Sequence, residues 1–169
     1  MIDASSDERM PAPAVERRDD LDRLVEVVWH SAAAGTGGKS WLVAVDGSEC
    51  SLRAVAMAAR LTALDPGTRV DVVYVQPWLV KEAAATDFAP LGWAVTAKAR
   101  QMLDGARVRW SVHLLMGEAA PHIIGMSERE GTCGVVVGSH GLTAAEALLL
   151  GSVAYKVAHH VDVPVMIVR

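Results

Sequence analysis

The sequence lacks several features that would place it in a specialised class. It has only two cysteines, Cys50 and Cys133, and no CxxC pair, so neither a disulfide framework nor a structural zinc site is expected. Its six histidines show no HExxH or comparable metal-binding spacing. No apolar run approaches the roughly 18 residues of a membrane span, and the polar N-terminus carries no secretory signal. A formal charge of −4 provides no basic field for nucleic acid or anionic lipid, so we expect a soluble, cytoplasmic protein without nucleic-acid or membrane partners.

What is present is enough apolar material for one complete domain. The chain has 169 residues, of which 51% are hydrophobic. We expect residues 39–169 to form that domain and residues 1–38 to be an N-terminal extension. The extension starts with a charged stretch, 1–19, that contains two prolines and should be disordered. Apolar residues then recur at i, i+3, i+4, i+7 and i+8, which predicts an amphipathic helix over 20–33; they are Leu21, Leu24, Val25, Val28 and Trp29.

The stretch AAGTGGKS, residues 33–40, fits the loosest form of a phosphate-binding loop. Such a loop must follow a strand and open a helix, so that backbone N–H groups face the phosphates. Here the expected order is helix, glycine loop, strand. The favoured interpretation is therefore a flexible linker before the first strand.

From residue 40 onward, short apolar runs alternate with helical patterns. We expect strands at 40–46, 70–76, 107–115, 133–139 and 163–168, and helices at 49–63, 91–104, 118–130 and 143–160, with 77–90 irregular between two prolines. Ser48 is a plausible N-cap for the first of these helices. This alternation predicts an α/β fold with a parallel sheet covered on both faces. Ligands in such folds bind beyond the carboxyl ends of the strands.

Two of those strand ends carry residues suited to a ligand. The first ends in Val-Asp-Gly-Ser, residues 45–48, and the fourth opens the pattern G-x-x-G-x9-G-S, which starts at Gly138 and ends at Gly151-Ser152. Gly138 and Gly141 would let a ligand approach the backbone. Gly151 falls in a strongly helical stretch, where glycine costs about 1 kcal/mol relative to alanine. Close approach of a phosphate and tight packing of the helix on the sheet explain it equally well.

The combination of V-D-G-S, G-x-x-G-x9-G-S and the closing VDVPVMIVR resembles the universal stress protein family over residues 39–169. The resemblance implies a single-domain, doubly wound, five-stranded parallel sheet of order 3-2-1-4-5 with helices on both faces. The N-terminal helix would be an addition to it. Relatives with this motif form the ATP-binding branch, so the resemblance implies an ATP-binding, Mg²⁺-dependent regulatory module of the stress response. It also implies a homodimer joined through the last strand, about 163–168, and an unknown protein partner.

The resemblance also assigns the residues that would hold the nucleotide. Asp46 would meet adenine and ribose, although an acidic residue in a turn can also simply bond nearby N–H groups. The other residues would form the floor of the site, back the adenine or line the ribose and phosphates; they are Ala44, Val45, Val75, Val137, Gly138, Ser139, His140, Gly141, Gly151, Ser152 and Val153. No residue is expected to bind a metal directly.

One departure from the family bears on the ligand. Relatives often carry an arginine or lysine after the second glycine, whereas residues 142–150 here include one glutamate and no cation. Charge-assisted hydrogen bonds are roughly twice as strong as neutral ones. Their loss would weaken the binding of ATP and shift the preference toward AMP, a cyclic nucleotide or no nucleotide. The alternative function is a degenerate member that acts as a protein-interaction module. No acid–base or nucleophile pairing is visible, so we expect no enzymatic activity beyond slow ATP hydrolysis.

Overall fold

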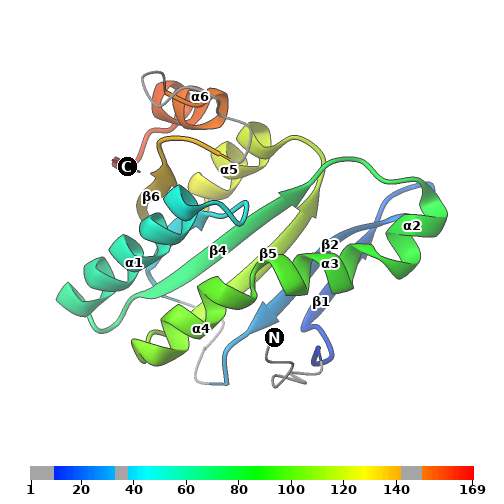
Figure 1. Ribbon diagram of the computed structural model, residues 1–169, viewed down its shortest axis with the longest axis horizontal. Helices are drawn as coiled ribbons and strands as arrows, with labels where there is room; N and C mark the ends of the chain where they lie inside the picture. Colours follow the sequence, from blue (N-terminus) through cyan, green and yellow to red (C-terminus); the bar gives the residue numbers. More distant parts are fainter. Residues whose placement is uncertain (1–9, 33–37, 142–149) are drawn as a thin grey trace, which may run out of the picture.

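A seven-stranded sheet forms the centre of the molecule (Figure 1). The computed structural model describes residues 10–32, 38–141 and 150–169. Its strand order is β1-β2-β5-β4-β3-β6-β7. The strands are β1 (Val15–Arg18), β2 (Leu24–His30), β3 (Ser40–Ala44), β4 (Arg69–Gln76), β5 (Trp110–Met116), β6 (Thr132–Gly138) and β7 (Val165–Val168). The helices are α1 (Glu49–Leu64), α2 (Lys81–Thr86), α3 (Phe88–Val95), α4 (Ala97–Gly105), α5 (Ala119–Ser127) and α6 (Ser152–His160).

The predicted α/β class is confirmed, but the predicted five-stranded sheet is wrong in strand number and in overall order. Five neighbouring strands, β5-β4-β3-β6-β7, pair in parallel as expected from the alternating pattern. Two further strands extend the sheet beyond β5, and both pair antiparallel. The sheet is therefore mixed, with a parallel majority.

Both strands are corrections to the prediction. β2 replaces the amphipathic helix predicted over 20–33, and β1 lies within the stretch 1–19 that was expected to be disordered. Residues Leu24–His30 form β2, which pairs along β5, and Leu21 lies in the preceding turn with 64% of its surface exposed. The misleading feature is that β2 has buried apolar residues on both faces. Val27 and Trp29 enter the larger core, while Val28 is buried on the other face, beside the half-buried Glu26 and His30. Such a run also satisfies a helical spacing, but its β-branched valines favour a strand.

The segment expected to be irregular, 77–90, is also a correction, because α2 and the start of α3 occupy most of it. Pro90 is the third residue of α3, and the first turn of a helix tolerates proline because its N–H groups lack intrahelical partners. The single helix predicted over 91–104 is two helices, α3 and α4, which meet at Thr96. Ser48 caps α1 as predicted, since its side chain accepts from the Ser51 N–H.

The last predicted helix, 143–160, begins later than expected. Residues 142–149 lie outside the described residues, and α6 starts at Ser152 with Gly151 as its N-cap. Gly151 has φ −61° and ψ 150°, an extended conformation. Gly151 therefore lies directly before α6.

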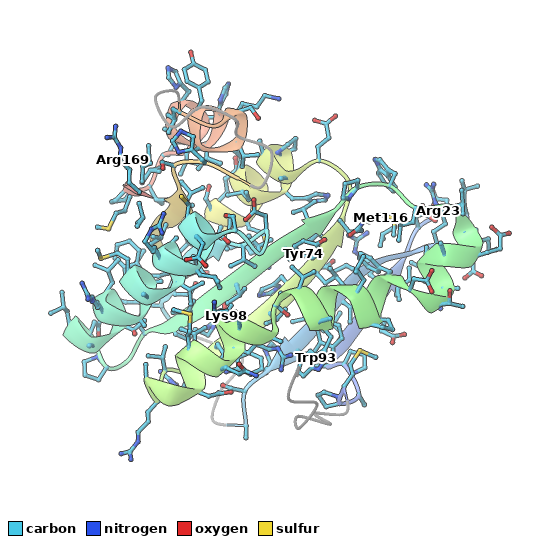
Figure 2. All side chains as sticks on the ribbon, viewed as in Figure 1. Arg23, Tyr74, Trp93, Lys98, Met116 and Arg169 are labelled. Carbon is cyan, nitrogen blue, oxygen red and sulfur yellow. The ribbon has the colours of Figure 1, made fainter. Side chains whose placement is uncertain are left out.

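Helices cover the two faces of the sheet unequally. The face in front in Figure 1 carries α1, α3 and α4 and the larger core, which includes Val43, Val72 and Leu114. Trp29 of β2 joins this core and lies 5.1 Å, centroid to centroid, from Trp93 of α3, which Figure 2 labels. The opposite face carries α5 and α6 over a smaller core that includes Leu42. No helix in the described part of the chain combines the length and apolar character that crossing a bilayer requires.

Candidate functional site

A cavity of about 460 Å³ lies beyond the carboxyl ends of the parallel strands, between α1, α5 and α6. This is the place where doubly wound sheets bind ligands. Of the residues predicted from the sequence, all but Ser139 line it: Ala44, Val45, Asp46, Val75, Val137, Gly138, His140, Gly141, Gly151, Ser152 and Val153. The fold thus brings together residues that lie far apart in the chain. Their role in binding remains a prediction.

Asp46 lies in the turn between β3 and α1, where its carboxylate is held in place. Its Oδ1 accepts the Ser48 N–H at 2.9 Å, so the local bonding considered as an alternative for this residue is present. Its Oδ2 lies directly against Gly141: a Cβ built on Gly141 would lie 2.6 Å from that oxygen. One carboxylate oxygen therefore fixes the turn, while the other lies at the cavity wall.

The three motif glycines are sites of close packing. A Cβ on Gly138 would approach the Cys50 backbone carbon to 2.9 Å, and one on Gly151 would approach the Ser139 carbonyl oxygen to 3.1 Å. Gly151 also donates its N–H to that same carbonyl at 2.8 Å, which ties the start of α6 to the end of β6. Tight packing, one of the two explanations left open for Gly151, is therefore realised. It also brings backbone close to the cavity.

Polar groups at one side of the cavity are suited to an anion. His140 accepts or donates through Nδ1 to the Ser139 hydroxyl at 2.8 Å. Its Nε2 is buried and has no hydrogen-bond partner among the described residues. The N-terminus of α6 lines the same space, and its N-cap, Gly151, has no side chain with which to cap the first N–H groups. Unpaired N–H groups at a helix start, together with the helix dipole, favour a negative ligand group.

Several residues that line the cavity were not predicted from the sequence. They are Ser51, Val73, Tyr74, Pro77, Ala119, Ile123 and Ala154. Tyr74, labelled in Figure 2, extends from β4 and donates its hydroxyl to the Gln76 side chain at 2.8 Å. Burial, and then the charge of Asp46, raise the pKa of Tyr74 above its usual value. Tyr74 adjoins the predicted Val75, so the only sequence signal for it was its place at the end of a strand.

The remaining sequence candidates do not form a second site of this kind. In AAGTGGKS, residues 33–37 lie outside the described residues, and Ser40 begins β3, so the pattern leads into a strand as expected. It joins two strands, not a helix and a strand. Lys39 lies 3.4 Å from the Asp65 carboxylate. Within the described ranges, no group of three or more His, Cys, Asp or Glu side chains could hold a metal ion.

The fold and the cavity define a doubly wound α/β protein with a candidate ligand site at the carboxyl ends of its parallel strands. A profile of the universal stress protein family matches residues 39–169. The chain belongs to the universal stress protein family. The matched region contains the five parallel strands and the cavity, and β1 and β2 lie before it.

Individual relatives agree with this assignment. The universal stress protein YxiE of Bacillus subtilis (strain 168) is 28% identical over 144 residues, which cover 76% of this chain and 97% of the relative. A solved universal stress protein in complex with cAMP has a TM-score of 0.64 at 23% identity, covering 78% of this chain and 97% of that one. The Archaeoglobus fulgidus universal stress protein in complex with dAMP has a TM-score of 0.61 at 22% identity, covering 80% and 100%. These two structures support the fold.

Proposed function

We propose that this protein is an adenine-nucleotide-binding regulatory module of the stress response. The observation that carries the proposal is the cavity itself. The Asp46 carboxylate, the packed glycines and the His140 ring, whose Nε2 has no partner among the described residues, surround one space. Two proteins of the same fold were solved with cAMP and with dAMP, which supports an adenine ligand here. Apolar side chains would hold the base, with Val75 against adenine and Asp46 near the ribose.

We further propose that a nucleoside monophosphate is the preferred ligand. The described cavity lining contains no lysine or arginine, and residues 142–149, outside the described ranges, contain none in the sequence. One phosphate can be bound by the first N–H groups of α6, the Ser152 hydroxyl and His140. Three phosphates would leave more negative charge without a cationic partner. ATP would depend on Mg²⁺ bound through its phosphates, because Asp46 is the one carboxylate in the described lining.

The protein would act by ligand occupancy and not by chemistry. The described lining of the cavity shows no nucleophile next to a base. Just outside the lining, the Ser139 hydroxyl contacts the His140 ring at 2.8 Å. Ser139 is 3% exposed and does not line the cavity, so its hydroxyl is not placed to attack a ligand. Slow ATP hydrolysis is the most that we expect.

Calorimetric titration of the full chain with AMP, cAMP and ATP plus Mg²⁺ tests both parts of the proposal. We expect AMP to saturate one site per chain and ATP to bind no more tightly than AMP. A strong preference for ATP would contradict the monophosphate proposal while leaving nucleotide binding intact. Absence of binding by all three would contradict nucleotide binding and favour the alternative, a protein-interaction module.

A homodimer through β7 is part of the proposal. β7 lies at one edge of the sheet and reads Val-Met-Ile-Val, with no charge, and Ile167 is 39% exposed. The opposite edge, β1, reads Val-Glu-Arg-Arg. Charged edge strands resist pairing with another chain, whereas uncharged apolar edges invite it. The β7 edge is therefore the one suited to a second copy.

A further inference from the structure

A second hollow lies at the opposite end of the sheet from the nucleotide cavity. It has a volume of about 580 Å³ and lies between the C-terminal halves of α1 and α4, which come together at the lower left of Figure 1. This volume falls in the range of about 300–1,000 Å³ that is typical of small-molecule sites. Helix α1 contributes Ser51 to the nucleotide cavity and its last turns to this second groove, so the two sites share an element but no lining residue.

Small and apolar residues make the groove hollow. Alanines at positions 56, 59, 63 and 106 line it, together with Pro66, Met102 and Val108. Alanine methyl groups leave space where the two helices pack, and Met102 supplies an adaptable apolar wall. The floor is therefore suited to the aliphatic or aromatic part of a ligand.

Three arginines surround this apolar floor: Arg60 on α1, and Arg107 and Arg109 in the connection from α4 to β5. The lining that the described residues form contains no acidic side chain. Arg109 donates to the Gly67 carbonyl at 2.7 Å. Within the described residues, neither the Arg60 nor the Arg107 guanidinium has an ion pair or side-chain hydrogen bond.

Two acidic residues that lie close in sequence to the groove lining, Asp65 and Asp104, are bonded elsewhere. Asp104 accepts the Trp110 indole N–H at 2.7 Å, and Asp65 pairs with Lys39 at 3.4 Å. The positive charge at the groove is consequently not neutralised by the acidic side chains beside it. Guanidinium groups present planar forks of N–H donors that match a carboxylate or a phosphate.

The backbone at Arg107 is an independent sign that an arginine matters there. Arg107 follows the C-cap of α4 with φ 56°, and the helix closes with bonds from the Arg107 N–H to the Asp104 carbonyl and from the Val108 N–H to the Leu103 carbonyl. This helix ending favours glycine at the left-handed position, because a Cβ disfavours that conformation. The chain places its glycine two residues earlier, at Gly105, and an arginine at the strained position. Strain of this kind is retained most often where it serves a function.

We propose that this groove binds a small organic anion, with its apolar part between α1 and α4 and its carboxylate or phosphate group at Arg60 and Arg107. The site is independent of the nucleotide cavity. Ligands of this class combine a hydrocarbon or aryl body with one negative head group. A ligand bound in the groove would connect the C-terminal ends of α1 and α4. The other end of α1 lies at the nucleotide cavity.

The probes are octanoate, octyl phosphate, 1-octanol and acetate, titrated calorimetrically into the full chain at fixed ionic strength. We expect both eight-carbon anions to bind at one site per chain, at least tenfold more tightly than octanol, which lacks the charge, or acetate, which lacks the body. The anion that binds with the higher affinity identifies the preferred head group. Protein saturated with AMP should bind the anions equally well. Failure of both anions to bind, or equal binding of octanol, would overturn the proposal.

Variants separate a built site from general attraction to a basic surface. Arg107→Gly removes the cation and relieves the strain of the left-handed backbone at this position. The variant should therefore keep the fold, while its affinity for octanoate falls about threefold to tenfold. Combined with Arg60→Gln, it should abolish the preference for octanoate over octanol. Lys156→Gln, which removes one positive charge from α6 on the other face of the sheet, is the matched control and should leave octanoate affinity unchanged. Unchanged binding in the double arginine variant, or an equal loss in the Lys156 variant, would contradict the proposed site.

Discussion

At the scale of single residues, the site depends on contacts that only glycine permits. The Asp46 carboxylate occupies space that a side chain at Gly141 would need, and α6 begins so close to Ser139 that Gly151 can carry no Cβ without displacement. The sequence motif includes these glycines, and the structure places them in the lining of the cavity. The motif could not show that each of them packs against the protein itself, because their contact partners lie far away in the chain.

Replacing Gly141 by alanine should therefore damage the site more than the fold. The new Cβ would meet Asp46 Oδ2 at 2.6 Å and displace the carboxylate, so we expect AMP affinity to fall about tenfold or more, by the loss of one charge-assisted bond. Calorimetry measures this loss. Gly125→Ala is the control, because a Cβ there meets nothing within 4 Å in α5; it should leave affinity unchanged and raise helix stability by up to about 1 kcal/mol. Equal AMP affinities in the two variants would contradict the role of this contact.

A buried carboxylate away from the site should govern acid stability. Asp71 is 8% exposed and forms a two-bond pair with Arg69 at 2.8 and 3.1 Å, with the His113 ring 3.8 Å away. Burial alone would raise the pKa of Asp71, but the neighbouring His113 ring and Arg69 guanidinium outweigh it and hold the pKa below its ordinary value.

Because the folded-state pKa of Asp71 is depressed, its contribution is present above the ordinary pKa of about 4 and is lost as pH falls through the folded value. We expect the free energy of unfolding to decrease by roughly 2 kcal/mol between pH 5 and pH 2 on account of this group. Urea denaturation at several pH values measures it. Asp71→Asn should lose most of that dependence, and an unchanged pH profile in this variant would contradict the assignment. Sequence reasoning missed the cluster because strand register, not sequence distance, brings Asp71 and His113 together.

At the scale of the elements, β2 shows where periodicity alone is ambiguous. A strand buried on both faces has almost continuous apolar character, and a helical stripe fits the same residues. The five parallel strands were predictable because turn residues separate them from well-patterned helices. The two N-terminal strands could not be predicted in this way. β2 pairs with β5 across more than 70 residues of chain, and the bond of 2.8 Å between His30 and Ser111 is one of these long-range contacts.

If β2 belongs to the core, then Trp29 should contribute strongly to stability. Its side chain is 1% exposed, packs against Trp93 with the two rings tilted by 51°, and donates its indole N–H to the Pro11 carbonyl at 3.1 Å. Trp29→Ala should lower the free energy of unfolding by about 3–5 kcal/mol in denaturant titrations. Trp78→Ala removes an equal side chain that is 58% exposed, so it should cost far less. Similar losses in both variants would show that the N-terminal strands are not integrated into the core.

At the scale of the whole molecule, the two edges of the sheet should behave differently in assembly. Ile167→Lys places a charge on the apolar β7 edge and should convert the proposed dimer to a monomer, measured by sedimentation or light scattering. Val15→Lys makes the same kind of change on the β1 edge, where Val15 is 47% exposed, and should leave the dimer intact. A native protein that is already monomeric, or dissociation by the Val15 variant instead, would contradict assembly through β7.

The most direct test of the central claim is to identify what the purified protein already holds. Native protein, prepared without added nucleotide, is denatured, and the released small molecules are identified and counted by chromatography with mass detection. We expect an adenine monophosphate near one per chain, or an empty protein that takes up AMP when it is added. Gly151→Val, whose side chain would collide with the Ser139 carbonyl, should abolish both the co-purified nucleotide and the uptake of added AMP. A protein that is empty and also fails to bind added AMP, cAMP or ATP with Mg²⁺ would contradict the account.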